Sequence, residues 1–275
     1  MELRLSKSPF HERAAIITQR EVYGFSLIEA YYPPKLRIST HSHEKANFCI
    51  ALQGICSELY GKKPREYKPL SLDFLPADHT HSLIFGSVPL RCFTVNVAPH
   101  LLKSLREYSL FLDESLHSHG GTLAWLFLRL YAEFLQKDTA SMLAIEGLVL
   151  EMLAAVSRKQ IDVPEPRPPR WLQQVKELLH AHFLDDLSLA AIAQEAGVHP
   201  VHLCREFRRH YASTVGQYIR RLRMEYACQM MLNPDISLGE IASAAGFADQ
   251  SHFARSFKRL VGMPPAAFRS KLRGC

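Results

Sequence analysis

The stretch Ser188-Leu-Ala-Ala-Ile-Ala-Gln-Glu-Ala-Gly-Val198 has a second copy, Ser237-Leu-Gly-Glu-Ile-Ala-Ser-Ala-Ala-Gly-Phe247, at an offset of 49 residues. Downstream, residues 203–209 align with residues 253–259 at an offset of 50, so the second copy has one more residue in its turn. Repetition of this kind indicates a duplicated structural unit. The repeat predicts an α-helical C-terminal region built from two similar units.

Each copy has the pattern of a helix-turn-helix. Ser188 and Ser237 are expected N-caps, because a serine oxygen accepts from free backbone N–H groups at a helix start. Gly197 and Gly246 stand where the chain must turn, a position that favours positive φ. Pro200 fits the first turn of the second helix, where its missing N–H costs no hydrogen bond.

The second helix of each copy has two faces. At about 100° per residue, Leu203 and Phe207 point inward, as do Phe253 and Phe257. The side chains expected on the outer faces are Val201, Cys204, Arg205, Arg208 and Arg209 in the first copy, and Ser251, Arg255 and Lys258 in the second. Both outer faces are therefore basic.

Basic outer faces of this kind fit DNA. An α-helix enters the major groove, where arginine can make a bidentate contact with guanine. The side chains expected at phosphates, which give affinity and register, are Arg208, Arg209, Lys258 and Arg259. Packed helices with solvated charges are the alternative, and two matching copies make it the weaker one.

The charge of the chain supports a polyanionic partner for this region. The 275 residues carry a net charge of +6, from 33 basic and 27 acidic residues. Residues 170–275 hold 14 basic and 9 acidic residues, whereas residues 1–169 hold 19 and 18. A basic C-terminal part behind a nearly neutral N-terminal part suggests two functions, the second performed on nucleic acid.

Residues 214–232 predict one long helix that joins the two copies, ended by Asn233-Pro234. A rigid joining helix could hold the two second helices about 34 Å apart, one turn of DNA, so that one chain reads two successive groove segments.

Residues 170–273 resemble the DNA-binding domain of the AraC/XylS transcription regulators. The resemblance rests on Ile241-Ala-Ser-Ala-Ala-Gly-Phe247, Ser251-His-Phe-Ala-Arg-Ser-Phe-Lys258 and Gly262-Met-Pro-Pro-Ala-Ala-Phe-Arg269. The base-reading positions that it implies are Val201, Cys204 and Arg205, then Ser251 and Arg255. The first helix departs from better-known members by its small apolar Val201 and Cys204, so it would depend on Arg205 and on contacts with thymine methyl groups.

The N-terminal part has the pattern of a β domain. Runs rich in aromatic and β-branched residues at 23–32, 47–52, 70–75 and 90–97 alternate with turn residues, which argues for a β-sandwich or barrel. Residues 123–134 and 143–153 have helical periodicity. The stretch 161–170 holds four prolines and predicts an extended linker.

Two histidine pairs, His41 with His43 and His79 with His81, would each lie on one face of an extended segment. Three neutral imidazoles could hold a divalent cation, and His41, His43 and His81 are the candidates. The segments around them resemble the two cupin motifs, with Asn47 where a glutamate ligand is usual and Asp78 in place of glycine. Because the anionic ligand is lost, we expect an effector pocket of His41, His43, Asn47, His79 and His81 without a metal or other cofactor.

The sequence therefore predicts a two-domain α+β protein. Its expected parts are a cupin-like sensory β-barrel over 1–98, a helical segment over 99–160 that could form a homodimer, a linker over 161–169, and a two-unit DNA-binding domain over 170–275. The resemblance implies a transcription regulator that is not an enzyme, with double-stranded DNA, a small-molecule effector and the transcription machinery as partners. A metal-dependent cupin enzyme with an appended DNA module and a constitutive DNA-binding protein with a structural barrel are the alternatives.

The same sequence predicts a cytoplasmic location. No secretory signal is visible at the N-terminus. The apolar segments 123–135 and 142–156 are interrupted by charges and are expected to be too short to span a membrane. The six cysteines have no regular spacing, which favours free thiols in a reducing compartment.

Overall fold

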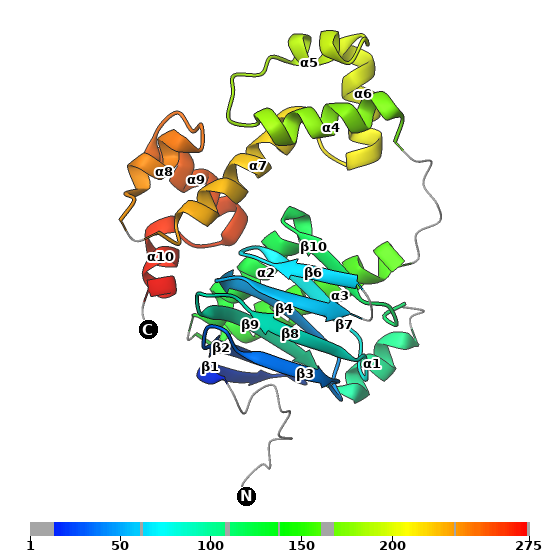
Figure 1. The fold of residues 1–275 in the computed structure, drawn as a ribbon, viewed down its shortest axis with the longest axis vertical. Helices are drawn as coiled ribbons and strands as arrows, with labels where there is room; N and C mark the ends of the chain where they lie inside the picture. Colours follow the sequence, from blue (N-terminus) through cyan, green and yellow to red (C-terminus); the bar gives the residue numbers. More distant parts are fainter. Residues whose placement is uncertain are drawn as a thin grey trace, which may run out of the picture. The chain divides into compact units, whose positions relative to one another are not determined.

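The computed structural model describes residues 14–60, 63–107, 111–136, 138–160, 168–233 and 235–273 (Figure 1). The chain divides into two compact units, a β unit within residues 1–162 and a helical unit that spans most of residues 163–273. Of the predicted linker, residues 161–167 lie outside the described residues.

The β unit contains two antiparallel sheets. Their strands are β1 (Ala15–Val22), β2 (Phe25–Tyr32), β3 (Arg37–His41), β4 (Asn47–Gln53), β5 (Cys56–Tyr60), β6 (Lys63–Tyr67), β7 (Ser71–Leu75), β8 (His81–Phe85), β9 (Leu90–Val97) and β10 (Leu116–His119). The larger sheet has the order β1-β2-β9-β4-β7-β10, and the smaller has the order β3-β8-β5-β6. The prediction of strands at 23–32, 47–52, 70–75 and 90–97 is confirmed.

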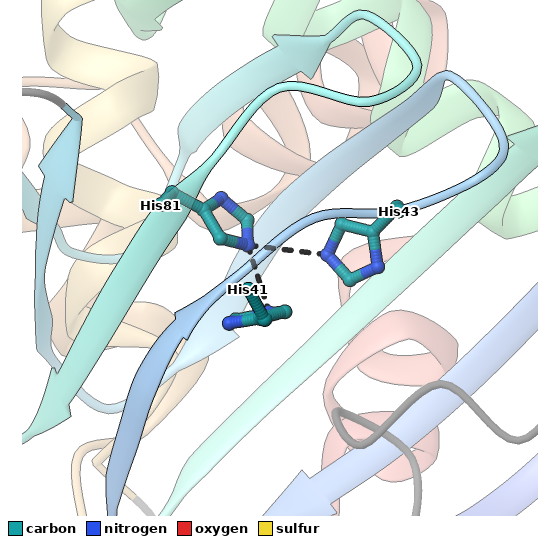
Figure 2. A group of neighbouring side chains, drawn as sticks. All are labelled: His41, His43 and His81. Atoms are coloured by element: carbon teal, nitrogen blue, oxygen red, sulfur yellow. Dashed lines mark hydrogen bonds between the residues drawn. The ribbon is translucent and has the colours of Figure 1, made fainter.

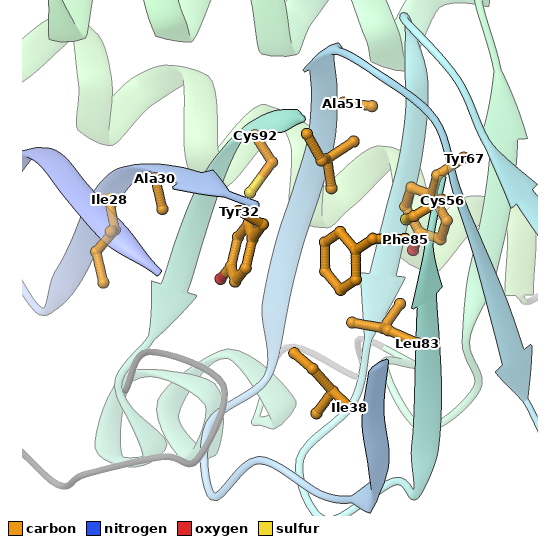
Figure 3. Packing of buried hydrophobic residues seen from close by; sticks show 11 residues of the cluster. Ile28, Ala30, Tyr32, Ile38, Ala51, Cys56, Tyr67, Leu83, Phe85 and Cys92 are labelled. Carbon is orange, nitrogen blue, oxygen red and sulfur yellow. The ribbon is translucent and has the colours of Figure 1, made fainter. Parts of the chain in front are cut away.

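The expected closed barrel differs from the observed arrangement, because the strand pairings of the described residues leave two separate sheets. Side chains from both sheets meet in one apolar cluster, in which Tyr32 of β2 stacks on Phe85 of β8 with ring centroids 5.1 Å apart (Figure 3). Successive side chains of a strand point to opposite faces of its sheet, so every second residue can contribute to this cluster. The result is the sandwich that the sequence pattern left open as the other possibility.

Three helices complete the β unit, α1 (Pro99–Arg106), α2 (Gly121–Phe134) and α3 (Ala140–Gln160). Phe127 of α2 packs on Phe48 of β4 and Phe93 of β9. A buried ion pair adds a polar tie, because Glu29 Oε1 accepts from both Arg91 and the Tyr131 hydroxyl of α2. Residues 99–160 were expected to form a helical segment, but they also contain β10, which pairs with β7.

Helix α3 is longer than the segment that the sequence predicted. It has 21 residues, and Ala140–Lys159 is long and apolar enough to cross a membrane by length and composition. The expectation that this segment is too short is therefore wrong. One side of α3 is buried within the protein, at Ile145, Val149, Met152, Leu153 and Val156. On the other side Leu143 is 71% exposed. This pattern is that of a helix packed on a core along one face.

The helical unit consists of α4 (Arg170–His182), α5 (Leu189–Glu195), α6 (Pro200–Tyr211), α7 (Val215–Met230), α8 (Leu238–Ala244), α9 (Gln250–Val261) and α10 (Pro265–Arg273). Its first half has a core that includes Leu172, Ile192, Leu203 and Phe207. In its second half Phe253 packs on Phe247 and Phe257. The predicted joining helix is confirmed as α7, which begins with a capping box at Thr214.

Candidate functional site

The two copies of the repeat form two helix-turn-helix units, α5–α6 and α8–α9. Ser188 Oγ accepts from the Ala191 N–H at 3.1 Å, and Ser237 Oγ accepts from the Glu240 N–H at 3.2 Å. Four residues separate α5 from α6 and five separate α8 from α9, which confirms the extra residue in the second turn. Both caps and the helix boundaries therefore agree with the prediction.

The turn glycines have the expected backbone conformation, with φ of +65° at Gly197 and +72° at Gly246. Pro200 occupies the first turn of α6. The inward-facing residues Leu203, Phe207, Phe253 and Phe257 are fully buried. We call α6 and α9, the second helices of the two units, the recognition helices.

The outward-facing residues are also where the helical wheel predicted them. On α6 the exposed residues include Val201, Cys204, Arg205, Arg208 and Arg209, and on α9 they include Ser251, Arg255, Lys258 and Arg259. Val201 is 69% exposed and leaves a methyl-bearing surface at the N-terminal end of α6. Each recognition helix thus presents a solvent-accessible face that can reach a ligand.

The arginines of α6 have an acidic neighbour that sequence reasoning missed. Glu206 Oε1 lies 3.2 Å from Arg205 Nε, and its Oε2 lies 3.8 Å from Arg209 Nη1. Arg205 Nη2 also contacts His202 Nδ1 at 3.0 Å. Glu206 is one residue after an outward arginine, so a charge count along the helix could have found it.

Arg255 of α9 stands in a different setting. The position after it is Ser256, and no ion pair involves Arg255 within the described residues. At the N-terminus of α9, Asp249 Oδ1 accepts from the His252 N–H at 2.6 Å and caps the helix. The outer face of α9 therefore keeps its positive charge without an internal counter-ion.

In the β unit, the structure brings together His41, His43 and His81 (Figure 2). The Nε2 atom of His81 lies 3.0 Å from Nε2 of His41 and 3.1 Å from Nε2 of His43. His41 ends β3 and His81 begins β8, and these two residues are register partners in the smaller sheet. Figure 2 shows the rings of His41 and His43 each joined to the His81 ring by a dashed line.

The far nitrogens of two rings have partners of their own. His41 Nδ1 lies 2.9 Å from the Ser39 carbonyl oxygen, and His81 Nδ1 lies 2.7 Å from Oε1 of the buried Glu58. Burial lowers the pKa of His41 below its ordinary value, which favours the neutral ring. Glu58 lies on β5, whose inward positions alternate with exposed ones, and that alternation was the signal by which the sequence could have identified it.

The remaining predicted pocket residues divide into two groups. Asn47 is buried and lines a cavity that His43 and His81 also line. His79 does not join the cluster, because it stacks on Tyr60 with ring centroids 5.8 Å apart. Residues 79–80 lie outside strand β8, so His79 is not in register with the cluster, and its place in the effector pocket stays a prediction.

Thiols and a second carboxylate also lie in the β unit. Cys49, Cys56 and Cys92 line the same cavity, and burial raises the pKa of Cys56, so this thiol stays protonated. The five cysteines that the structure describes are free, as expected. Burial raises the pKa of Asp73 to about 7, and Asp73 contacts Tyr67 and His117. Asp73 and these partners were not among the residues predicted from the sequence.

The comparisons with known proteins address the helical unit first. Residues 192–271 match the family model described as "Helix-turn-helix domain". The match covers most of the two units and both exposed second helices, so the class of this unit is a helix-turn-helix domain.

Several curated relatives are named as transcription regulators. The chain is similar to the Msm operon regulatory protein of Streptococcus mutans, with 25% identity over 62% of this chain and 63% of the relative. It is also similar to the HTH-type transcriptional activator RhaS of Escherichia fergusonii, with 28% identity over 48% of each chain, and to a putative AraC-like transcription regulator of Streptomyces lividans, with 28% identity over 55% of this chain and 52% of the relative. Residues 192–271 of the chain thus form a helix-turn-helix domain, and the chain is similar to regulators that include an AraC-like one.

The chain spans less than two thirds of the length of these curated relatives. Among solved structures, it is similar to ToxT from Vibrio cholerae O395, with a TM-score of 0.40 and 15% identity over 92% of this chain and 99% of that one. It is also similar to the C-terminal domain of AraT from Geobacillus stearothermophilus, with a TM-score of 0.36 and 26% identity over 38% of this chain and 88% of that one.

Proposed function

We propose that this protein is a sequence-specific DNA-binding transcription regulator that is controlled by an effector at its β unit. One observation carries the proposal. Two helix-turn-helix units of matching build, joined by α7, each expose a basic recognition helix. A helix of this kind fits the major groove, and two of them in one chain can read two successive groove segments.

The DNA contacts follow from the exposed faces. We assign base contacts to Val201, Cys204, Arg205, Ser251 and Arg255. We assign phosphate contacts to Arg208, Arg209, Lys258 and Arg259. Arginine offers a bidentate contact to guanine, and the apolar surface of Val201 suits a thymine methyl group. Phosphate contacts supply affinity and register and depend steeply on salt.

The β unit is the proposed effector domain. We interpret it as a cupin-like fold, with residues 1–98 as its sensory part, and we place the effector in the cavity that His43, Asn47 and His81 line, with His41 beside it. An effector acts only if it binds two arrangements of the protein with different affinity. In the proposed mechanism, it changes which DNA segments the domain over residues 170–275 can occupy.

The remaining partners belong to the same proposal. Residues 99–160 would form a homodimer, residues 161–169 would connect the two parts, and the transcription machinery of the cytoplasm would be the final partner. The base-reading and effector sites need no catalytic group, and the proposed function is not enzymatic. The alternative, a metal-dependent cupin enzyme with an appended DNA module, differs in one respect: it would turn over a substrate, whereas a regulator would only bind its effector and DNA.

Selection of bound sequences from a random duplex pool tests this function with the full chain. We expect enrichment of one motif with two elements, at about 0.15 M salt, and a shift in its occupancy when cell extract is added. As a matched control, the Arg255→Ala variant should lose preference at one element and keep the other. Failure of the wild-type chain to enrich any sequence over bulk competitor would overturn the proposal.

A further inference from the structure

We infer that Arg223 of α7 is a positioning residue that fixes the relative placement of the two recognition helices. Its guanidinium donates to three backbone carbonyl oxygens: Nε to Phe183 at 2.7 Å, Nη2 to Asp185 at 3.0 Å and Nη1 to Gly246 at 2.8 Å. Phe183 and Asp185 lie between α4 and α5, whereas Gly246 lies in the turn between α8 and α9. One side chain therefore connects the first helix-turn-helix unit to the second.

The segments that Arg223 contacts both lead into a helix of a unit. Phe183 and Asp185 precede α5, the first helix of the first unit, and Gly246 precedes α9, the recognition helix of the second unit. The direction of a helix follows from the backbone at its start. A carbonyl held in each segment thus restricts how the two units can turn relative to α7.

The planar guanidinium suits this task. It offers five N–H donors in a rigid fork, and all three nitrogens of Arg223 are used. Hydrogen bonds from a charged donor are also stronger than those from a neutral one. Lysine would offer one mobile ammonium group, which cannot reproduce the geometry of the fork.

Packing along α7 keeps Arg223 in place. The residues on either side of it in the sequence, Leu222 and Met224, are buried. Three residues further along, the Tyr226 ring contacts the Phe183 ring edge to face, with centroids 5.9 Å apart. The backbone that carries Arg223 is therefore anchored close to one of the carbonyls that it holds.

The turn glycines of the two units differ in their surroundings. A Cβ at Gly246 would lie 2.9 Å from Arg223 Cζ and 3.1 Å from its Nε and Nη1. Within the described part of the chain, no such neighbour lies within 4 Å of a Cβ built at Gly197, the equivalent residue of the first unit. Both glycines have positive φ, but only Gly246 must also leave room for a side chain of another helix.

This inference rests on the proposed function in taking α6 and α9 as helices that read one duplex together. Two helices of one chain contact two elements of a duplex only if their separation matches the spacing of the elements. If the separation is fixed, an added base pair moves one unit off its bases. If it is not fixed, each unit can follow its own element, at the cost of ordering the connection on binding.

The spacing dependence of DNA binding tests this role, with the full chain and the duplex found by selection. In the wild type, one base pair added between the two contacted elements should weaken binding by about 100-fold, because one unit loses its bases. In Arg223→Lys this loss should shrink to about tenfold, because the units are no longer held by the fork. The measurement is the ratio of the affinities for the original and the lengthened duplex.

Arg221→Lys is the matched control on the same helix. Arg221 lies over the Tyr218 ring, with its Cζ 4.7 Å from the ring centroid, so this variant should keep the wild-type ratio. A merely structural role of Arg223 would weaken binding to both duplexes alike and leave the ratio unchanged. An unchanged ratio in Arg223→Lys would therefore overturn the inference.

The two turn glycines provide a second pair of variants. Gly246→Ala and Gly197→Ala both place alanine at positive φ, but only the alanine at 246 also displaces the Arg223 guanidinium. Gly246→Ala should therefore reduce the spacing loss as Arg223→Lys does, and Gly197→Ala should keep it. Circular dichroism checks each variant, and Gly246→Ala replaces Arg223→Lys if the latter does not fold. Equal ratios for the two glycine variants would contradict the inference.

The placement of the recognition helices is also measured without DNA. Spin labels on Cys204 of α6 and on a cysteine introduced on α9 by Lys258→Cys, in a chain with Cys275→Ser, report the distance between these helices. The distance distribution should broaden about twofold in Arg223→Lys, because the rigid fork is lost, and should stay as narrow as in the wild type in Arg221→Lys.

This second measurement separates the two hypotheses. A wild-type chain that prefers no duplex, with a distribution that broadens in Arg223→Lys, would overturn the proposed function and leave the positioning role standing. A chain that binds its selected duplex, with equally narrow distributions in the wild type and in Arg223→Lys, would overturn the positioning role alone.

Discussion

The two recognition helices have the same inner face and different outer faces. Leu203 and Phe207 of α6 occupy the same places as Phe253 and Phe257 of α9, and all four are buried. Outside, α6 pairs its arginines with Glu206, whereas α9 carries Arg255 with a serine beside it. The comparison teaches that packing requirements keep two copies alike on the side of the core, while the exposed side is free to differ in what it reads.

The largest effect should come from the shared inner face. Phe207→Ala and Phe257→Ala should each cost about 3–5 kcal/mol of unfolding free energy, because each removes a fully buried ring. Denaturant unfolding of the full chain measures this. Clearly unequal costs would show that the two cores are not equivalent.

The second-largest effect should distinguish the outer face of α9 from that of α6. Arg255→Ala should cost about 1–3 kcal/mol on the selected duplex and relax base preference there. Arg205→Ala should cost less binding free energy, because Arg205 already donates hydrogen bonds to Glu206 and His202. The measurement is the ratio of the affinities for the selected duplex and for an unrelated duplex. If Arg255→Ala leaves this ratio unchanged, Arg255 does not read a base.

The helix caps should differ by a smaller amount. Ser237 has a full capping box with Glu240, but Ser188 has Ala191 at the matching position. Both serine-to-alanine variants should lose about 1 kcal/mol of unfolding free energy, and Ser237→Ala should lose more. Thermal unfolding of the two variants provides the comparison, which equal losses would contradict.

The same cap adds a pH dependence. The Ser237 backbone N–H and side chain lower the pKa of Glu240, so its folded pKa lies below the unfolded value. Its contribution is therefore present above the unfolded pKa and is lost as the pH falls through the folded pKa. Thermal unfolding between pH 6 and pH 3 should show a slightly steeper loss for the wild type than for Glu240→Gln.

The smallest effect should come from the ion pairs of α6. Glu206→Gln releases Arg205 and Arg209 and should tighten binding to any duplex by less than about 1 kcal/mol, with a steeper salt dependence. Lys258→Ala on α9 should do the reverse and weaken all sequences alike. Affinity measured against salt concentration detects both changes. Parallel slopes for the wild type and both variants would exclude these side chains from phosphate contact.

Much of the helical unit followed from sequence alone. The caps, the turn glycines, the buried faces and the extra residue in the second turn all depend on contacts within about a dozen residues. The β unit was harder. Its four predicted strands were found, yet β1 and the shorter strands β3, β5, β6, β8 and β10 were not identified. Short strands carry few residues from which to detect alternation.

The recognition helices and the sites built from distant residues also differ in how far the sequence predicts them. By its own pattern the sequence determined which faces of α6 and α9 meet solvent, because a helix turns through a fixed angle at each residue. Only the tertiary structure decided that His41 lies beside His81, that Glu58 Oε1 lies 2.7 Å from His81 Nδ1, and that Arg223 reaches two turns at once. These groups are 23 to 40 residues apart. Strand register and helix crossing bring them together, and no local periodicity encodes either.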